Sequence, residues 1–283
     1  MFVSQYTRQL FLNFFLQMII DTHTHLYLKN FSEDIDEVMK RATDEGVRKF
    51  YLPAIDSSEM ENLLSLEKKY PGVCFAMMGL HPCSVKENYK QELDLVYTWL
   101  QKRKFAAIGE IGLDLYWDKT FIDQQYQSFY QQIEWALKFN TPVVIHTRNA
   151  MQQSIDVIKE YAGKNLRGIF HCFSGTLQNA LDIIDTGFYL GIGGVITYKN
   201  AGLAEVIKEI DLKHIVLETD APYLTPVPFR GKRNESSYIK YVVQKIAEIK
   251  NVTIEEVDKI TTANAEYIFD NSNVTKSPPP GEI

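Results

Sequence analysis

Eight short apolar runs recur along the chain, and each is followed by a stretch with the periodicity of an amphipathic helix. Most of these runs are continuously apolar rather than alternating, as parallel strands covered on both faces are. The runs lie at 18–25, 49–55, 73–80, 105–111, 142–146, 168–173, 188–193 and 214–218. Eight strand–helix units in about 250 residues match the (β/α)8 architecture, so we expect an α/β fold of the TIM-barrel type.

An open, doubly wound sheet is the rival arrangement for such a pattern. It would carry a glycine-rich phosphate loop after the first strand, and the segment DTHTHLYLKN contains no glycine. No change of composition divides the middle of the chain, so we expect one domain over 18–270, closed by helices at 236–250 and 254–260. Residues 1–17 are expected to be an N-terminal extension, with Met18 an alternative start, and 271–283 a disordered tail.

Composition narrows the class of protein. Hydrophobic residues make up 45% and charged residues 23%, ordinary values for a soluble globular chain. The net charge of -6 argues against strong non-specific binding to duplex nucleic acid, but it allows a nucleic-acid substrate held by a locally basic site. Cys74, Cys83 and Cys172 form no CxxC pair, which favours reduced thiols and a cytoplasmic location. No apolar run is long enough to span a membrane, and no surface stripe indicates an obligate protein partner.

The histidines are not scattered along the chain. Catalytic groups of a (β/α)8 barrel lie at the carboxyl ends of its strands, and five of the six histidines fall at such ends. These five are His23, His25, His81, His146 and His171. Carboxylates share the same ends, with Glu110 and Asp114 at the end of the fourth run and Glu218 and Asp220 at the end of the eighth. Packing alone would call for apolar residues at these points, so the clustering indicates a metal site at the carboxyl ends of the strands.

The inventory favours two ions over one, because a closed zinc site uses only four ligands. The candidate ligands are His23, His25, Glu110, His146, His171 and Asp220. His23, His25 and Asp220 would hold one ion, since the first and last strands of a barrel are neighbours. His146 and His171 would hold the other, and Glu110 would bridge the two.

Two divalent ions (Zn, Mn or Mg) would stabilise the attacking and leaving oxygens of phosphoester cleavage and lower the pKa of a bound water. We therefore assign catalytic roles to two of the ligands. Glu110 would hold the ions together, and Asp220 would also accept a proton from the water as a general base.

A basic segment, RGKRNES, follows the eighth run and supplies Arg230, Lys232 and Arg233. Loops after the seventh and eighth strands of a barrel often bind phosphate, so we expect these side chains to contact an anionic substrate. Arg148 lies two residues beyond His146 and is expected to point into the same site.

Three further residues complete the predicted substrate-binding set. His81 is a candidate to contact a phosphate oxygen or the leaving group, with a structural role as the alternative. Asp114 lies beside the site and is also a candidate to orient a metal ligand. Tyr223 is a candidate to stack on a base, although aromatic residues at a barrel rim often only pack.

Seven stretches together resemble the TatD family of metal-dependent hydrolases. In order they are IDTHTHL, GLHP, IGEIGLD, PVVIHTR, HCFSG, LETDAPYL and RGKRNE, spanning 20–235. The resemblance implies a (β/α)8 barrel, a dinuclear site made by the six ligands named above, and 3′-to-5′ exonuclease activity on single-stranded DNA. Thr24 stands where Cys is common in that family, and Ser236 where Pro often ends the basic loop, which would loosen the substrate clamp. The N-terminal extension has no counterpart in the family pattern.

Two other functions remain open at this point. An amide or ester hydrolase, such as a D-aminoacyl-tRNA deacylase, would use the same ions and the same water. A barrel that only binds nucleic acid or protein, having lost catalysis, would need no converging imidazoles. Loss of activity on metal removal separates the second of these alternatives from an enzyme.

Overall fold

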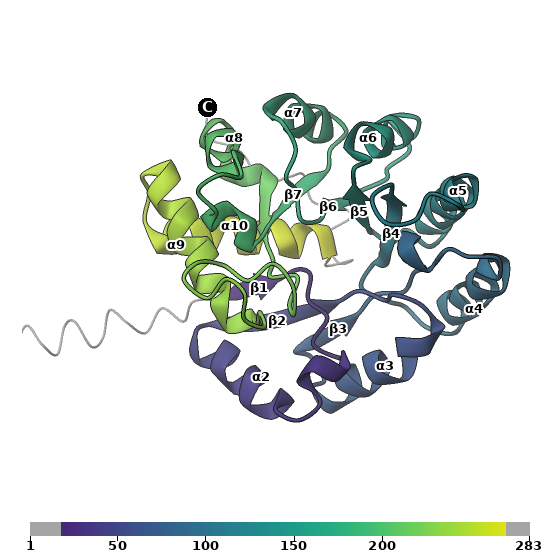
Figure 1. Cartoon of the computed structure of the whole chain (residues 1–283), viewed down its shortest axis with the longest axis horizontal. Coiled ribbons are helices and arrows are strands. Elements are labelled where there is room, and N and C mark those ends of the chain that lie inside the picture. The colour runs from purple at the N-terminus through teal and green to yellow at the C-terminus, as the bar shows by residue number, and fades with distance from the viewer. Residues whose placement is uncertain (1–17, 270–283) are drawn as a thin grey trace, which may run out of the picture.

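The computed structural model describes residues 18–269, which form a ring of eight parallel strands surrounded by helices (Figure 1). The strands pair in sequence order in two sets, β1-β2-β3 and β4-β5-β6-β7-β8. A parallel bridge between Met78 and Ile108 joins the two sets on one side. On the other side the amide of Thr22 donates to the carbonyl of Leu217 at 2.9 Å, which joins β8 to β1. The expectation of a (β/α)8 barrel is therefore confirmed.

The element bounds are as follows. The strands are β1 (Ile19–Asp21), β2 (Val47–Leu52), β3 (Cys74–Ala76), β4 (Ile108–Asp114), β5 (Val143–Arg148), β6 (Gly168–Phe170), β7 (Tyr189–Ile192) and β8 (Ile215–Leu217). The helices are α2 (Ile35–Asp44), α3 (Met60–Lys69), α4 (Tyr89–Lys102), α5 (Ile122–Phe139), α6 (Met151–Lys159), α7 (Leu177–Asp185), α8 (Leu203–Glu209), α9 (Ile239–Lys250) and α10 (Ile254–Phe269). Short 3-10 turns include η1 (Lys29–Phe31) and η3 (Pro82–Ser84). The expected extension at 1–17 and tail at 271–283 lie outside the described residues.

Several strands are shorter than the apolar runs predicted. β1 ends at Asp21, because the amides beyond it leave the pattern of a regular strand, in which residues two apart bond to the same neighbour: Thr22 bonds to Leu217, but Thr24 bonds to the carbonyl of Tyr51. The two histidines of this segment therefore lie on a loop, and the strand alternation that predicted their convergence does not apply to them. β4 is displaced to Ile108–Asp114, so its two acidic residues lie within the strand.

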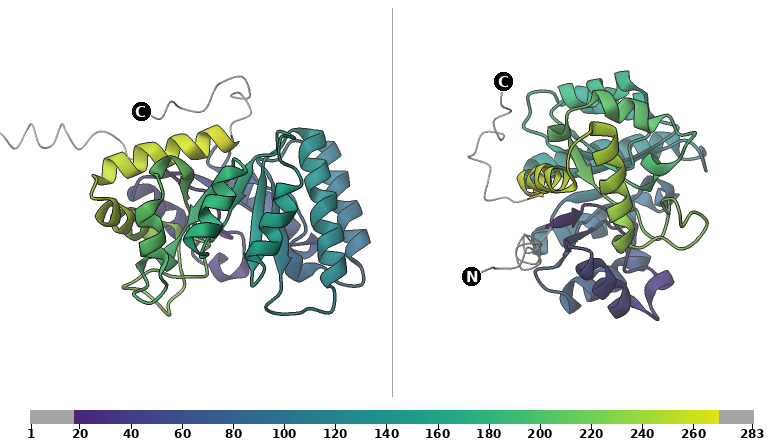
Figure 2. Two further views of the ribbon diagram at one scale, coloured as in Figure 1. Left: turned by 90° about the horizontal axis from the view of Figure 1, so that it is seen from above. Right: turned by 90° about the vertical axis from the view of Figure 1, so that its left-hand side faces the viewer.

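The interior of the barrel is filled by one apolar layer. Its residues come from seven of the eight strands or the residues beside them: Ile20, Tyr51, Met77, Ala107, Val144, Ile169 and Val216. Helix α10 lies across the end of the barrel opposite the long loops (Figure 2), and its Ala265, Ile268 and Phe269 pack against this layer. This packing explains why α10 continues to Phe269 rather than stopping near 260. With the amino end of the barrel closed, the polar residues gather at the carboxyl ends of the strands.

Candidate metal centre

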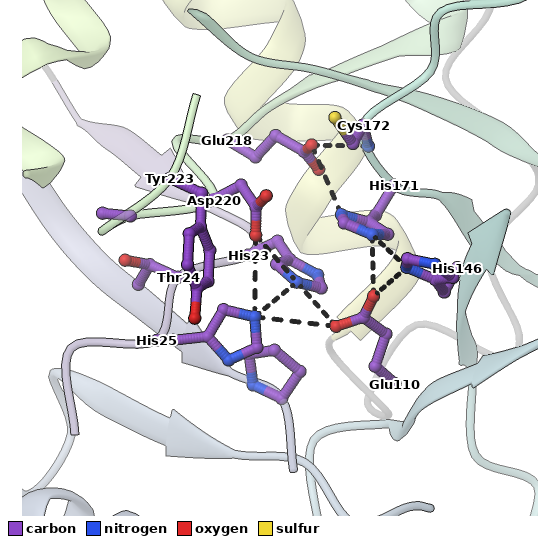
Figure 3. A network of polar contacts seen from close by, with 12 residues as sticks. His23, Thr24, His25, Glu110, His146, His171, Cys172, Glu218, Asp220 and Tyr223 are labelled. Atoms are coloured by element: carbon purple, nitrogen blue, oxygen red, sulfur yellow. Dashed lines mark hydrogen bonds and ion pairs between the residues drawn. The ribbon is translucent and has the colours of Figure 1, made fainter. Parts of the chain in front are cut away.

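All six predicted ligands converge at the carboxyl ends of the strands (Figure 3). The first group surrounds His23, whose Nε2 lies 3.3 Å from His25 Nε2, 3.1 Å from Glu110 Oε2 and 3.6 Å from Asp220 Oδ1. His25 Nε2 lies 3.6 Å from both of these carboxylate oxygens. Four donor atoms, from β4 and from the loops that follow β1 and β8, thus face a common point.

The second group surrounds the other oxygen of the same glutamate. Glu110 Oε1 lies 2.7 Å from His146 Nδ1 and 2.8 Å from His171 Nε2, and these two nitrogens are 3.4 Å apart. Glu110 is only 2% exposed and directs one oxygen to each group. This is the arrangement that a bridging carboxylate requires.

The distances within the first group fit a metal ion. Ligands about 2.1 Å from a tetrahedral ion are separated by roughly 3.4 Å from one another. Five of the six separations among the donors of His23, His25, Glu110 and Asp220, all except that between the two carboxylates, run from 3.1 to 3.6 Å. Lone pairs held this close repel one another unless a cation or a proton lies between them, so the donor set is suited to a divalent cation.

The hydrogen bonds at the far side of His25 select its tautomer. The hydroxyl of Tyr27 donates to the carbonyl of Pro53 at 2.6 Å, so its oxygen accepts from His25 Nδ1 at 3.1 Å. A proton on Nδ1 leaves the lone pair of His25 on Nε2, the atom that faces Glu110 and Asp220. Tyr27, which sequence reasoning did not single out, therefore prepares His25 as a ligand.

Asp114 plays the same part for His146. Its Oδ2 lies 3.0 Å from His146 Nε2, which fixes the proton on Nε2 and turns the Nδ1 lone pair toward Glu110. Its Oδ1 accepts the amides of Tyr116 and Trp117. With both oxygens bonded and the residue 1% exposed, Asp114 orients His146, in keeping with the second role considered for it, and presents no free oxygen to a substrate.

His81 carries its proton on the same ring nitrogen as His146, but in His81 that nitrogen faces the site. Its Nδ1 accepts the amide of Cys83 at 3.0 Å, so in the neutral ring the proton lies on Nε2, 3.4 Å from Glu110 Oε1. His81 therefore presents a donor, not a lone pair, to the site. Its position within ligand distance of Glu110 and His146 is consistent with contact to an oxygen of the substrate.

Glu218 is a residue that the sequence placed at the strand end without a role. It is fully buried, its Oε1 accepts the amide of Cys172 at 2.5 Å and lies 3.6 Å from His171 Nδ1, and its Oε2 has no partner among residues 18–269. Cys172 has a φ of 49°, an uncommon conformation for a residue other than glycine, and Glu218 stabilises that turn. The alternation of acids in LETD was the signal, because it places Glu218 behind His171 and Asp220 in the centre.

Glu110 and the histidines around it shift one another's pKa values. Burial raises the pKa of Glu110, but the nearby imidazoles of His171, His81 and His23 outweigh it and hold that pKa well below its usual range. Burial lowers the pKa of His171, yet the charge of Glu110 holds it well above the ordinary value. For His23, burial and the neighbouring His171 both lower the pKa. The site thus favours positive charge next to Glu110, as a cation site should.

A further buried acid, Asp21, lies beneath the ligands. Asp21 accepts hydrogen bonds from Ser236 Oγ at 2.6 Å and from Thr219 Oγ1 at 2.7 Å, and burial raises its pKa to about 7. Ser236 Oγ also lies 3.5 Å from Thr24 Oγ1. The two positions at which this chain departs from the family pattern are therefore neighbours. Ser236 is buried and bonded, so the end of the basic loop is fixed rather than loosened.

The four basic residues of the predicted substrate-binding set fall into two groups, according to whether their charges are occupied by other residues. Arg148 and Arg230 are exposed, and their guanidinium groups stack on tyrosine rings, Arg148 on Tyr116 at 4.0 Å and Arg230 on Tyr198 at 4.4 Å. Lys232 is also exposed. No hydrogen bond or ion pair to another described residue occupies these three cations.

Arg233 belongs to the other group. Both of its terminal nitrogens bond Asp34, at 2.8 and 2.6 Å, and one also bonds the carbonyl of Asn30. Its donors therefore anchor the basic loop to the start of α2, and the structure does not bring it to the ligands. Tyr223 is 52% exposed, and its ring lies 6.2 Å from that of His25 at the edge of the centre (Figure 3).

A (β/α)8 barrel with imidazoles and carboxylates converging at the carboxyl ends of its strands is the architecture of metal-dependent hydrolases. A family model described as "TatD related DNase" matches residues 20–270. The chain belongs to the TatD family of metal-dependent hydrolases, as the sequence motifs indicated. Among residues 18–269, no helix has the combination of length and apolar character needed to cross a bilayer.

Individual relatives agree with this assignment. The chain is 39% identical over 253 residues to the "Uncharacterized metal-dependent hydrolase YabD" of Bacillus subtilis, with 89% of this chain and 99% of that one covered. It is 29% identical over 257 residues to the "3'-5' ssDNA/RNA exonuclease TatD" of Erwinia tasmaniensis, covering 89% and 99%. The crystal structure of YjjV, a TatD homologue from Escherichia coli, superposes with a TM-score of 0.85 at 29% identity, covering 90% and 99%.

Proposed function

We propose that this hydrolase cleaves phosphodiester bonds and removes nucleotides from the 3′ end of single-stranded DNA with two divalent ions. The proposal rests on the position of Glu110, whose Oε2 faces His23 and whose Oε1 faces His146. His23, His25 and Asp220 would hold one ion, and His146 and His171 the other. The name of the Erwinia relative supports the substrate class.

When bound, a pair of divalent ions would supply Lewis-acid stabilisation of the attacking and leaving oxygens and a water of lowered pKa. Asp220 would accept the proton of that water. Burial raises the pKa of this carboxyl, but the neighbouring imidazoles of His171 and His23 bring it below the usual value, so Asp220 is ionised at neutral pH. Its Oδ1 faces the histidines, while Oδ2 takes no part in those contacts.

Other side chains of the protein would donate hydrogen bonds to the substrate around the reacting phosphate. His81 would donate its Nε2 proton to a phosphate oxygen or to the leaving oxygen. Arg148, Arg230 and Lys232 would bind the phosphates on either side of the scissile bond, because their charges are not neutralised within the described residues. A small set of local cations suits a protein whose net charge is -6.

The test is hydrolysis of a labelled single-stranded DNA by protein stripped with a chelator, then supplied singly with Mg²⁺, Mn²⁺ or Zn²⁺. Oligonucleotides labelled at the 5′ end show the direction of digestion as a descending ladder. We expect activity to return with at least one metal and to be absent from the Glu110→Ala variant. Two bound ions per chain with no cleavage of DNA would refute the nuclease and direct the search to amide or ester substrates.

A further inference from the structure

The exposed aromatic rings of the described residues lie at one end of the barrel. Among residues 18–269, the exposed Phe, Tyr and Trp side chains are Tyr116, Trp117 and Tyr223, with exposed fractions of 50, 67 and 52%. Tyr116 and Trp117 follow β4, and Tyr223 follows β8, so all three lie at the end of the barrel that carries the metal centre. Packing does not account for a tryptophan with two thirds of its surface in water.

The loop that carries Trp117 is tied to the centre. Asp114 Oδ1 accepts the amides of Tyr116 and Trp117 at 3.0 and 3.1 Å, while Oδ2 of the same carboxylate bonds His146. The rings of Tyr116 and Trp117 contact each other edge to face, with centroids 4.7 Å apart. One buried acid thus sets the position of the ligand His146 and of the exposed indole together.

Arg148 lies against the rings of Tyr116 and Trp117. Its guanidinium lies 4.0 Å from the ring centroid of Tyr116 and 5.0 Å from that of Trp117. Stacking holds its plane without using its N–H donors, and no described residue accepts from them. Arg233, which is bonded to Asp34 through both terminal nitrogens, shows how an arginine with a structural role is occupied in this protein.

We propose that Trp117 is a stacking platform for one nucleobase of a single strand, and that Arg148 binds the phosphate next to that base. The inference deepens the proposed function and rests on it. A ring face accepts any base, so the platform supplies affinity without sequence preference. In a duplex the base faces are covered by their neighbours, so the platform favours single strands and unpaired 3′ ends over paired ones.

The test compares Trp117→Ala and Trp117→Phe with Leu181→Ala, which removes another exposed apolar side chain, on the outer helix α7. We expect Trp117→Ala to lower kcat/KM on single-stranded DNA by about 5- to 150-fold, mainly through KM, the range for loss of one stacked base. Trp117→Phe should keep most of the activity. Hydrolysis of an oligomer made only of abasic deoxyribose phosphates, which carries no aromatic ring, should stay within about twofold for every variant.

Oligonucleotides with a single abasic residue, moved stepwise from the 3′ end, identify the stacked base. At one position the wild-type protein should fall to the level of Trp117→Ala, and the variant should be insensitive to the lesion. Additive losses at every position, unchanged kinetics on DNA, or an equal loss on both substrates would overturn the platform.

The platform and the nuclease can fail separately. If the wild-type protein, supplied with metal, cleaves neither DNA nor the abasic oligomer, the proposed function is wrong. Binding of a fluorescent single-stranded oligonucleotide, measured with the chelated protein, then decides the platform alone. Weaker binding by Trp117→Ala than by Leu181→Ala supports it, and equal binding refutes it.

Discussion

Replacing Asp114 by Asn changes one proton at the candidate metal centre while preserving the shape of the side chain. The amide oxygen can still accept the amides of Tyr116 and Trp117, but the amide nitrogen then faces His146 Nε2 as a donor. His146 must give up its Nε2 proton to accept that bond, and the proton moves to Nδ1, the atom that lies 2.7 Å from Glu110. The lone pair that we assign to an ion is then lost.

Loss of an orienting partner of this kind costs roughly 10- to 100-fold in metal affinity, or about 1.4–2.7 kcal/mol. Because His146 belongs to only one donor group, we expect Asp114→Asn to weaken one of two binding steps in a calorimetric titration of the stripped protein with Zn²⁺ or Mn²⁺. The step assigned to His23, His25 and Asp220 should change by less than about threefold. Two equally weakened steps would refute the division of ligands, and two unchanged steps would refute the tautomer argument.

Asp118→Asn is the matched control for this experiment. Asp118 lies on the same loop and pairs with Lys86 at 2.7 Å, and no histidine contacts it. Its substitution removes a carboxylate of the same charge from the same segment. Both titration steps should therefore stay at the wild-type values.

Three further outcomes follow from the contacts described above. Glu218→Gln keeps an acceptor for the amide of Cys172 but removes the charge behind His171, so kcat should fall by about tenfold or more while the thermal midpoint stays near wild type. Arg41→Ala should lower the free energy of unfolding in urea by roughly 1–2 kcal/mol at pH 7 and by less at pH 3. Burial raises the pKa of Glu235, but its hydrogen bonds from Arg41 hold that pKa below the usual value. The stability that this ion pair contributes is therefore present above about pH 4.5 and is lost as the pH falls. Met77→Ala, in the filled interior of the barrel, should cost about 2–5 kcal/mol in the same assay without altering metal binding.

The sequence could predict the features of this molecule that depend on the local order of residues. Apolar runs revealed the eight strands, and the rule that function lies at their carboxyl ends brought the six candidate ligands together before any coordinates were known. The convergence of His23 and His25 was predicted from strand alternation, but the structure achieves it on a loop. There the amides bond to β8 and β2 in turn.

The sequence could not predict which distant residues would form hydrogen bonds or ion pairs with one another. Arg233 belongs to a basic segment typical of phosphate binding, yet its charge is taken by Asp34, 199 residues earlier. His81 was left between a substrate contact and a structural role, and a single backbone amide, from Cys83, turns its proton toward the site. Neither choice is encoded in residue type or spacing, because each depends on which groups the closed barrel brings within hydrogen-bonding distance.

The seam between the first and last strands has a consequence for how the protein is made. Thr22 bonds to Leu217 there, and the amide of Asp220 donates to the carbonyl of His23 at 2.9 Å, so the first and the last ligand segments to be synthesised meet directly. A growing chain on the ribosome holds no complete centre until Asp220 has emerged, nearly two hundred residues after His23. With the ligands assigned as proposed, any incomplete product of translation that ends before that point lacks the means to hydrolyse, whatever else of the barrel it has formed.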